Sequence, residues 1–376
     1  MKIYLDNAAT TKVKKDVISV MVEAMGNYYG NSSSIHSIGR AAEDALEKSR
    51  ESLSAIIGGD KDGVIFNSGA TEGNNQIIRA YGKPGAHLIT TCIEHKSVLL
   101  AMKNAQKNGA QVDYLGVDEN GQISLDELKE KMTKNTALVS IMMVNNETGL
   151  STDSKAIAQV IRSISKKTKF HVDAVQSFLK YPIDVKDMDI DFLTVSAHKV
   201  HGPKGLGFLY VKKGQKPESL LLGGEHEKRI RAGTVNVPGI IAFDYAAKKL
   251  HEDQDKNRAH VYNLKKAFIN GLDGFTGIHI NSPLEGSSAY ILNVSFEGIR
   301  GETFLHYLDG KGISVATGSA CNSKDTKNSH VLEAMHLDKQ QLLGSIRFSF
   351  EEETTMEEIT YTLEIIEEAL HFLRRI

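Results

Sequence analysis

One stretch decides the fold class: Ser196-Ala197-His198-Lys199-Val200-His201-Gly202-Pro203-Lys204-Gly205. It follows the apolar run Phe192-Leu193-Thr194-Val195, which predicts a buried strand, and it ends in a turn rich in glycine. A lysine at the end of a buried strand, beside serine and histidine, can form a Schiff base with a carbonyl cofactor. Most lysines lie on the protein surface, so Lys199 alone does not establish such a site.

Outward from this stretch, short apolar runs alternate with longer amphipathic ones. The sequence predicts strands at 64–66, 87–91, 111–115, 137–144, 170–172, 192–195 and 206–211, and helices at 41–57, 72–81, 95–108, 125–132 and 154–166. Strands separated by helices of this length predict an α/β fold, with a mostly parallel sheet covered on both faces. In such sheets ligands bind at the carboxyl ends of the strands.

The remainder of the chain has a different pattern. Residues 237–272 read as helical, interrupted by a charged stretch around 252–258. Strands at 289–296 and 345–350 then mix with helices at 302–308, 329–335 and 356–373. This mixture predicts a smaller α+β domain. We expect a large domain at 14–258 and a small domain formed by 1–13 and 259–376, with Cys321 on a polar loop at 310–327.

The composition excludes several classes of protein. The chain has 376 residues, 41% hydrophobic and 24% charged, with a formal net charge of −2. Such a charge gives no strong field for nucleic acid or anionic membranes, and no apolar run is long enough to span a bilayer. The N-terminus turns polar too soon for a signal peptide, so we expect a cytoplasmic protein. Two cysteines imply no disulfide framework, and the histidines show no convincing metal-binding pattern.

Polar residues follow other predicted strands as well. Ser68-Gly69-Ala70-Thr71-Glu72 opens a helix after 64–66 and could cradle a phosphate, whereas Asp173 and Gln176 follow 170–172. Taken singly, a helix cap is the commoner explanation for Thr71 or Asp173. Taken together with Lys199, they answer the four needs of pyridoxal phosphate (PLP): its phosphate, ring nitrogen, phenolic oxygen and aldehyde.

The ordered set of motifs resembles the class V aminotransferase-fold enzymes and, more narrowly, the group I (NifS-like) cysteine desulfurases. The likeness runs nearly end to end. Besides 196–205 and 68–72, it is carried by Tyr4-Leu5-Asp6-Asn7-Ala8-Ala9-Thr10-Thr11, Gly30-Asn31-Ser32-Ser33-Ser34-Ile35-His36, Glu94-His95-Lys96-Ser97-Val98, Val144-Asn145-Asn146-Glu147-Thr148-Gly149, His171-Val172-Asp173-Ala174-Val175-Gln176-Ser177, Arg231-Ala232-Gly233-Thr234, Gly318-Ser319-Ala320-Cys321 and Ser345-Ile346-Arg347-Phe348-Ser349.

The resemblance implies an aspartate aminotransferase-like, PLP-dependent transferase fold and assigns the cofactor's contacts. Lys199 would bind the aldehyde of PLP and later move protons, and His95 would stack on the ring and act in acid–base steps. Asp173 would pair with the ring nitrogen, and Gln176 would bind the phenolic oxygen. The remaining cofactor contacts, most of them to the phosphate, would come from Ala70, Thr71, Asn146, Ser196 and His198, and from Thr234 of the neighbouring subunit.

For the reaction, the resemblance implies that Asn146 and Arg347 bind the carboxylate of L-cysteine. Cys321 would take the sulfur as a persulfide, and L-alanine would be released. A thiol on a polar loop suits an acceptor that must move, although free cysteines are often buried, as we expect for Cys92. The family is homodimeric, and it delivers sulfur to an iron–sulfur scaffold protein or to a sulfurtransferase for tRNA or thiamine.

Three other functions were weighed against this one. A related PLP reaction, such as transamination or selenocysteine lysis, depends less on Cys321. A nicotinamide dehydrogenase would need a Gly-x-Gly-x-x-Gly turn between a strand and a helix, with an acid following, which this chain lacks. A non-catalytic scaffold of the same fold would have lost residues such as Lys199, yet the set is complete. The chain departs from the family pattern at Ser32, and also at Glu225 and Arg229, which lie in a stretch near the expected subunit boundary.

Overall fold

The computed structural model describes residues 2–317 and 328–374. Its central sheet contains β2 (Val64–Asn67), β3 (His87–Thr91), β4 (Gln111–Leu115), β5 (Thr136–Met142), β6 (Lys169–Asp173), β7 (Phe192–Ser196) and β8 (Gly207–Val211). The seven strands lie in the order β2-β8-β7-β6-β5-β3-β4. Neighbours from β7 to β4 run parallel, whereas β8 is antiparallel to both β7 and β2. The predicted α/β fold with a mostly parallel sheet is confirmed.

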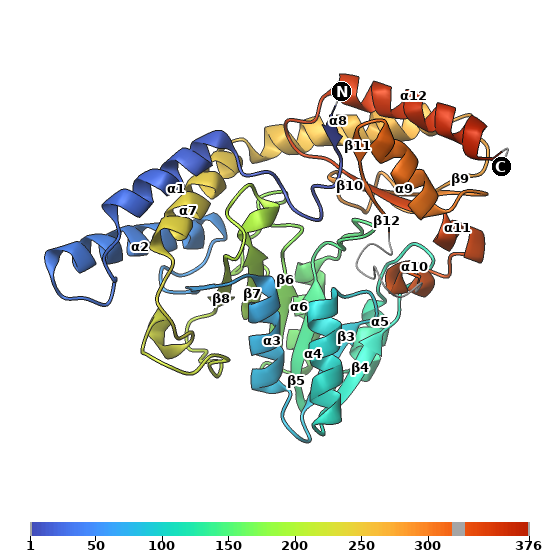
Figure 1. The fold of residues 1–376 in the computed structure, drawn as a ribbon. Helices are drawn as coiled ribbons and strands as arrows, with labels where there is room; N and C mark the ends of the chain where they lie inside the picture. The colour runs from blue at the N-terminus through green and yellow to red at the C-terminus, as the bar shows by residue number, and fades with distance from the viewer. Residues whose placement is uncertain (1, 318–327, 375–376) are drawn as a thin grey trace.

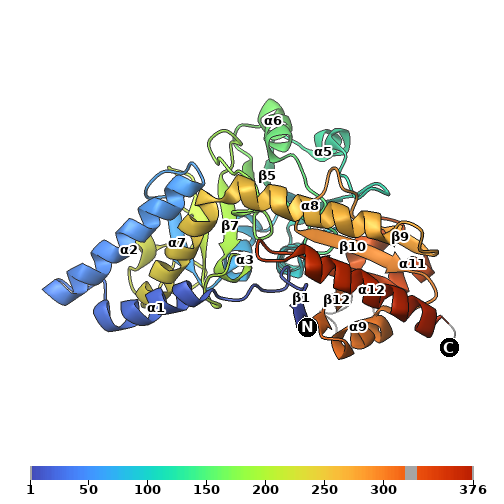
Figure 2. The same ribbon diagram turned by 90° about the horizontal axis from the view of Figure 1, so that it is seen from above.

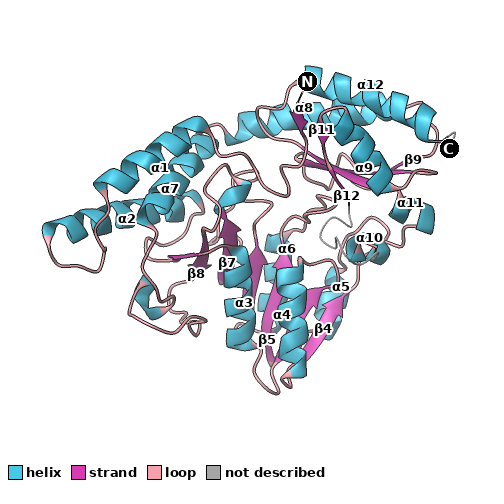
Figure 3. Ribbon diagram, in the orientation of Figure 1, coloured by secondary structure: helices cyan, strands magenta, loops and turns pink. Residues whose placement is uncertain are grey.

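Helices cover both faces of this sheet. Successive residues of a strand point to opposite sides, so apolar side chains on both faces are buried against helices. Val64 and Phe66 face α2 (Ser37–Ile56), α5 (Leu125–Lys131), α6 (Ser154–Ile164) and α7 (Val237–Glu252) in one apolar core. Ile65 faces the other core, formed with α3 (Ala70–Tyr81) and α4 (Lys96–Lys107). Figure 1 shows α3 and α4 in front of the strands, and Figure 3 shows the same strands in magenta. Burial on both faces explains the continuous apolar runs in the sequence.

A second sheet is antiparallel throughout and contains β9 (Ile278–Ile280), β10 (Ile291–Phe296), β12 (Ala316–Thr317) and β13 (Ser345–Ser349), in the order β12-β13-β10-β9. It shares an apolar core with α8 (Gln254–Leu272), α9 (Gly301–Gly310) and α12 (Met356–Leu373). The ring centroids of Phe268 and Phe348 lie 4.8 Å apart in this core. The short helices α10 (His330–Ala334) and α11 (Lys339–Leu343) complete this part of the chain. Figure 2 shows α8 extending from α7 across to α12.

The N-terminal segment joins the two sheets. Strand β1 (Ile3–Tyr4) pairs in parallel with β11 (Ile313–Ser314), and the carbonyl of Leu5 accepts a hydrogen bond from the Ser349 N–H at 2.7 Å. Farther along, the Thr11 N–H donates to the carbonyl of His198 at 2.9 Å, just past the end of β7. Helix α1 (Lys15–Asn27) then packs against α7. Residues 5–11 therefore pass directly over the carboxyl end of the central sheet.

Several predicted boundaries differ from the structure. The helical region 237–272 breaks only at Asp253, between α7 and α8. The charged stretch read as an interruption lies mostly within α8, because Asp255 and Lys256 point to solvent. The strand predicted at 137–144 ends at Met142, and His95 caps α4 rather than lying inside it. Among the described residues, no helix is long and apolar enough to cross a membrane.

Candidate active site

A cavity of about 430 Å3 lies where the carboxyl ends of β5, β6 and β7 meet the N-terminal segment, β12 and β13. The parallel strands explain this convergence, because their carboxyl ends share one edge of the sheet. Most of the site residues predicted from the sequence line this cavity: Ala70, Thr71, His95, Asn146, Asp173, Gln176, Ser196, His198, Lys199 and Arg347.

Lys199 closes the tight turn Ala197–Lys199 that follows β7. Its Nζ donates hydrogen bonds to the backbone carbonyls of Ala8 at 2.6 Å and Ala9 at 2.7 Å. Desolvation lowers the pKa of Lys199 to about 7, with further lowering by the charges of Arg347 and Lys180. A neutral amine has two N–H groups, and the two carbonyls accept both. Its lone pair is therefore left for an electrophile.

Asp173 is the last residue of β6 and is buried. Its Oδ2 accepts a hydrogen bond from the Asn74 side chain at 2.8 Å, and its Oδ1 accepts from the Val175 N–H at 3.0 Å. Asn74 is itself fixed, because its Oδ1 accepts from the Thr194 hydroxyl at 2.6 Å. These bonds hold the carboxylate at one orientation, as a partner for a cationic ring nitrogen requires.

His95 is the N-cap of α4. Its Nδ1 accepts a hydrogen bond from the Ser97 N–H at 3.1 Å and lies 2.8 Å from the Ser97 hydroxyl. A nitrogen that accepts from a backbone N–H carries no proton, so in the neutral ring the proton is on Nε2. Burial lowers the pKa of His95, opposed by the charge of Asp173. The neutral ring therefore presents an Nε2–H donor.

The wall formed by β7 and the start of α3 suits an anion. Gly69 has φ +138°, which lets the chain turn sharply from β2 into α3. The Ala70 N–H, at the start of that helix, donates to the Ser196 hydroxyl at 2.9 Å. Burial and the charge of Lys199 lower the pKa of His198 to about 4, so its ring is neutral at pH 7. Ser196, His198 and the N-terminus of α3 thus offer hydrogen-bond donors to a phosphate.

Arg347 projects from β13 at the opposite side of the cavity. Its guanidinium donates to the Asn146 carbonyl at 2.8 Å and to the Asp6 carboxylate at 2.7 Å. The buried Nε has no hydrogen-bond partner among the described residues. The second N–H group on each of the two terminal nitrogens of Arg347 suits the carboxylate of an amino acid.

Sequence reasoning missed Glu147 as a cavity residue. Its side chain lines the cavity beside Asn146, and it accepts a hydrogen bond from the Ser329 hydroxyl. Burial raises the pKa of Glu147, although Ser329 and the charges of His330 and Arg347 oppose the shift. Ser97 and Asp6 were also missed. All three lie inside the motifs quoted above: Glu147 next to Asn146, Ser97 close to His95, and Asp6 close to Ala8. Their closeness in sequence to these residues could have identified them.

Two predicted site residues are not brought to the cavity by the described chain. Thr234 is exposed and does not line it. Cys321 lies outside the described residues. The other cysteine, Cys92, is half-buried rather than fully buried as expected, and burial raises the pKa of its thiol.

The departures at Glu225 and Arg229 pair with each other, because their side chains form an exposed ion pair at 2.7 Å. Between them, Glu227 is buried and forms two hydrogen bonds of 2.8 Å with Arg50. The backbone at Glu227, Lys228 and Arg229 has positive φ values of 45°, 58° and 66°. Such angles are unfavourable for residues other than glycine, so the buried pair holds this turn in place.

The residues present fit PLP. The cavity combines an amine whose pKa is near neutrality, a buried carboxylate fixed by hydrogen bonds, an anion-binding wall and a guanidinium. Its volume is within the range of small-molecule sites. The amine suits the aldehyde of PLP, the carboxylate suits its ring nitrogen, and the anion-binding wall suits its phosphate. The guanidinium suits the carboxylate of an amino acid.

Comparison with known proteins agrees with this donor set. The model of the family "Aminotransferase class-V" matches residues 3–361. The cysteine desulfurase IscS of Neisseria meningitidis serogroup C is 39% identical, covering 100% of this chain and 93% of the relative. A cysteine desulfurase of Nostoc sp. is 40% identical, with 99% and 94% covered.

Solved structures show the same relationship. A NifS-like protein superposes with a TM-score of 0.93 at 38% identity, over 99% of this chain and 100% of that one. The protein SspA, solved in complex with cysteine, gives a TM-score of 0.83 at 31% identity, over 94% and 100%. The chain therefore belongs to the class V aminotransferase family and, within it, to the PLP-dependent cysteine desulfurases.

Proposed function

We propose that this enzyme converts L-cysteine to L-alanine with PLP bound at Lys199, and that it transfers the sulfur to Cys321 as a persulfide. One observation carries the proposal: Lys199, Asp173 and Arg347 line a single cavity of about 430 Å3. An amine, an acid and a guanidinium in this arrangement suit a carbonyl cofactor and an amino-acid substrate together.

The cavity lining supports the proposed contacts with the cofactor. When bound, PLP supplies an electron sink for the substrate's α-carbon. Lys199 offers its lone pair to the aldehyde, because its two N–H groups are held by Ala8 and Ala9. Asp173 keeps a proton on the ring nitrogen, and the Gln176 amide donates to the phenolic oxygen. Ala70, Thr71, Ser196 and His198 hold the phosphate.

The substrate's contacts lie at the other side of the cavity. Arg347 and Asn146 hold the carboxylate of L-cysteine, and the guanidinium does so through parallel N–H groups. His95 lines the same cavity, and in its neutral ring Nε2–H would be the donor available to substrate. Lys199 would carry the proton that leaves and returns at the α-carbon.

Cys321 enters the proposal from its sequence motif. Its thiolate attacks the substrate's sulfur, so that an S–S bond forms as the Cβ–S bond breaks. The electron pair of the broken bond takes up a proton, and alanine leaves. The sulfur is oxidised by two electrons when it becomes the outer sulfur of the persulfide, and the β-carbon is reduced by the same two electrons when its bond to sulfur is replaced by a bond to hydrogen, so no added oxidant is needed.

The test is to measure alanine and persulfide from L-cysteine, using purified enzyme with added PLP and a reducing thiol. Equal amounts of alanine and total released sulfur are expected. Lys199→Ala should lose the absorbance of bound PLP. Cys321→Ala should keep that absorbance and lose the persulfide, whereas the matched control Cys92→Ala should retain both. Sulfide production by Cys321→Ala at the wild-type rate would exclude Cys321 as the acceptor.

We also propose a homodimer in which Thr234 reaches the partner's phosphate site. Exposed apolar side chains on and near α1 support this, among them Ile18, Val22, Met25 and Tyr29, at 49%, 64%, 59% and 71% exposure. Figure 1 shows α1 and α2 at the edge of the molecule farthest from α12. Light scattering should give about twice the 41.3 kDa of one chain. Val22→Asp should halve that mass, and Lys107→Asp, on α4, should not.

The final acceptor is proposed to be an iron–sulfur scaffold protein or a sulfurtransferase for tRNA or thiamine. Enzyme charged with radiolabelled sulfur from L-cysteine should pass the label to such a partner. Transfer should require Cys321 and survive Cys92→Ala. Absence of transfer to either class of acceptor would contradict this part of the proposal.

A further inference from the structure

Lys180 is a buried cation that the sequence did not single out. It lies in the turn after β6 and is 7% exposed. Its Nζ donates a hydrogen bond to the Gln176 side-chain oxygen at 3.2 Å and lies 5.4 Å from the centroid of the Tyr290 ring. A buried ammonium is costly unless polar groups compensate it, so these contacts explain why it is tolerated.

The contact with Lys180 determines which way the Gln176 amide points. An ammonium only donates hydrogen bonds, so the amide must turn its oxygen toward Lys180. The Gln176 Nε2 then donates to the Ala8 carbonyl at 2.9 Å, the same carbonyl that accepts from Lys199 at 2.6 Å. The second N–H of Gln176 remains available in the active-site cavity, which Gln176 lines. A reversed amide would place donors against donors.

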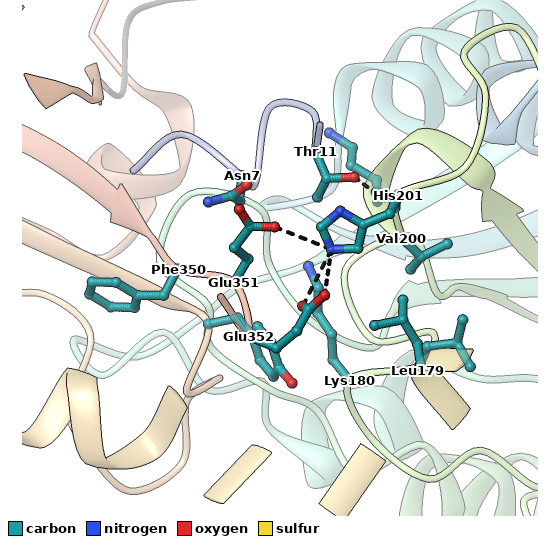
Figure 4. A pocket seen from close by; sticks show the side chains of 12 residues that line it. Asn7, Thr11, Leu179, Lys180, Val200, His201, Phe350, Glu351 and Glu352 are labelled. Carbon is teal, nitrogen blue, oxygen red and sulfur yellow. Dashed lines mark hydrogen bonds and ion pairs between the residues drawn. The ribbon is translucent and has the colours of Figure 1, made fainter. Parts of the chain in front are cut away.

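Lys180 does not itself line the active-site cavity. A second cavity, of about 20 Å3, is lined by Lys180, Lys199, His201, Glu351 and Glu352, among others. Figure 4 shows Lys180 among these side chains, with one ring nitrogen of His201, Nε2, in contact with both glutamates. Lys199 lines both cavities, whereas Lys180 lines only the smaller one.

The charges around the two lysines differ. Lys199 is affected by Arg347 and Lys180, which lower its pKa, and by Asp6 and Asp173, which raise it, whereas burial is the largest effect. Burial lowers the pKa of Lys180 to about 8, with Glu352 opposing and Arg347 adding to the shift. The Gln176 oxygen and the Tyr290 ring that contact the Lys180 Nζ both favour its charged form.

We propose that Lys180 is a positioning residue, whose ammonium orients the Gln176 amide toward the cofactor and disfavours a second ammonium at Lys199. Lys199 thereby meets the aldehyde of PLP as a free amine. The inference rests on the proposed function, because it concerns the same cofactor site. It assigns no contact between Lys180 and the cofactor or substrate.

The test uses the full chain before and after loading with PLP. Before loading, the rate at which acetic anhydride acylates Lys199 is followed against pH by mass spectrometry of its peptide. After loading, the pH midpoint of the absorbance of bound PLP is measured. Lys180→Met should raise both midpoints by roughly one pH unit, so that free amine at neutral pH falls about tenfold. It should also move the absorption maximum, because Gln176 is no longer oriented.

Two variants control for charge and for folding. Lys180→Arg keeps the positive charge and should leave the midpoint of Lys199 where it is in the wild type. Lys265 is an equally buried lysine that donates to Pro283, Ser287 and Ser288, and it lines neither cavity. Lys265→Met should therefore leave both midpoints and the spectrum unchanged, even if it lowers the melting temperature.

The outcomes separate this inference from the proposed function. If Lys180→Met lowers the melting temperature but moves neither midpoint nor spectrum, Lys180 is only structural and the proposal is overturned. If Lys180→Arg shifts the midpoint as much as Lys180→Met, the charge argument is overturned. If borohydride reduction attaches no PLP to Lys199 in the wild type, the proposed function itself fails, while acylation still reports on the lysine pair.

Discussion

The guanidinium of Arg347 and the carboxylate of Asp6 form a 2.7 Å hydrogen bond that joins β13 to the N-terminal segment at the wall of the active-site cavity. Arg347 also donates to the Asn146 carbonyl at 2.8 Å. Both bonds fix the plane of the guanidinium before any ligand arrives. The side chain assigned to the substrate is therefore preorganised.

Replacing Arg347 by lysine should preserve the charge but lose the planar fork. We expect the KM for L-cysteine to rise about tenfold to a hundredfold, because a charge-assisted pair of hydrogen bonds is reduced to one. The absorbance of bound PLP should be retained. Steady-state kinetics and absorbance spectra test this prediction. The control is Arg374→Lys, because Arg374 donates hydrogen bonds to the carbonyls of Glu297 and Gly277, beside the second sheet and away from the cavity. An unchanged KM would remove Arg347 from the substrate site.

Asn74→Ala should destabilise the protein by about 1–3 kcal/mol, because it leaves polar partners buried and unpaired. Asp173, Ser97 and Thr194 each lose a hydrogen bond to this side chain. The dissociation constant for PLP should rise several-fold as Asp173 loses its orientation. Urea unfolding and PLP titration measure the two effects. The neighbouring change Asn75→Ala, which removes a bond to the Thr71 carbonyl, is the control. Equal effects of both changes would contradict the prediction.

Glu227→Gln should cost about 3–5 kcal/mol of unfolding free energy, because it leaves the buried guanidinium of Arg50 with only the partly exposed Glu47 as counter-charge. The side chains of Arg50 and Glu227 are 3% and 2% exposed and 2.8 Å apart. Arg229→Gln breaks the adjacent but exposed pair with Glu225 and should cost well under about 1 kcal/mol. Urea unfolding of both variants decides the matter. Similar losses would show that the strained turn, rather than burial, sets the cost.

Glu352 should contribute stability that acid removes. Burial alone would raise its pKa, but the hydrogen bond and charge of His201, with Lys14, lower it from 4.5 to about 2. A carboxyl whose pKa is lower in the folded state stabilises the protein above pH 4.5 and loses that effect as the pH falls toward 2. Glu352→Gln should therefore cost about 2 kcal/mol at pH 7 and little at pH 2.

Urea unfolding across that pH range tests the prediction for Glu352. The adjacent change Glu353→Gln removes a carboxylate that is 69% exposed and also pairs with Lys14. Its loss of stability should be smaller and should vary less with pH. A constant difference between Glu352→Gln and the wild type from pH 7 to pH 2 would show that the carboxylate's charge is not the cause.

Local patterns predicted much of the fold. The bounds of β3, β4 and α12 agree with the predicted ranges, because alternating or helical periodicity is strong there and turns or caps mark the ends. The antiparallel direction of β8 could not be read from the sequence. A buried strand has the same apolar composition in either direction. Only the length of the connection to the preceding strand restricts the direction in which it can run.

Some residues of the active site could likewise be predicted from the sequence, and others could not. Lys199, Asp173 and Ser196 could be placed because each lies at or just after the end of a strand, and parallel strands bring their ends together. Asn74 and Lys180 could not, because their roles depend on hydrogen bonds made in the folded chain, such as that between Asn74 and Asp173 across 99 positions. Glu227 looks like one charge among several in its segment, and only burial against Arg50 distinguishes it.

The two carbonyls that accept from Lys199 belong to Ala8 and Ala9. Their contribution comes from the main chain, so systematic replacement of side chains by alanine would pass over both positions without effect. Mutational surveys of this enzyme would then record these two positions as tolerant of change. Replacing an amide by an ester weakens its carbonyl as a hydrogen-bond acceptor. Such a replacement reveals the contribution of Ala8 or Ala9 only when the ester carbonyl is placed at one of these two positions. Backbone chemistry, rather than side-chain genetics, is therefore the way to measure how the lysine is held.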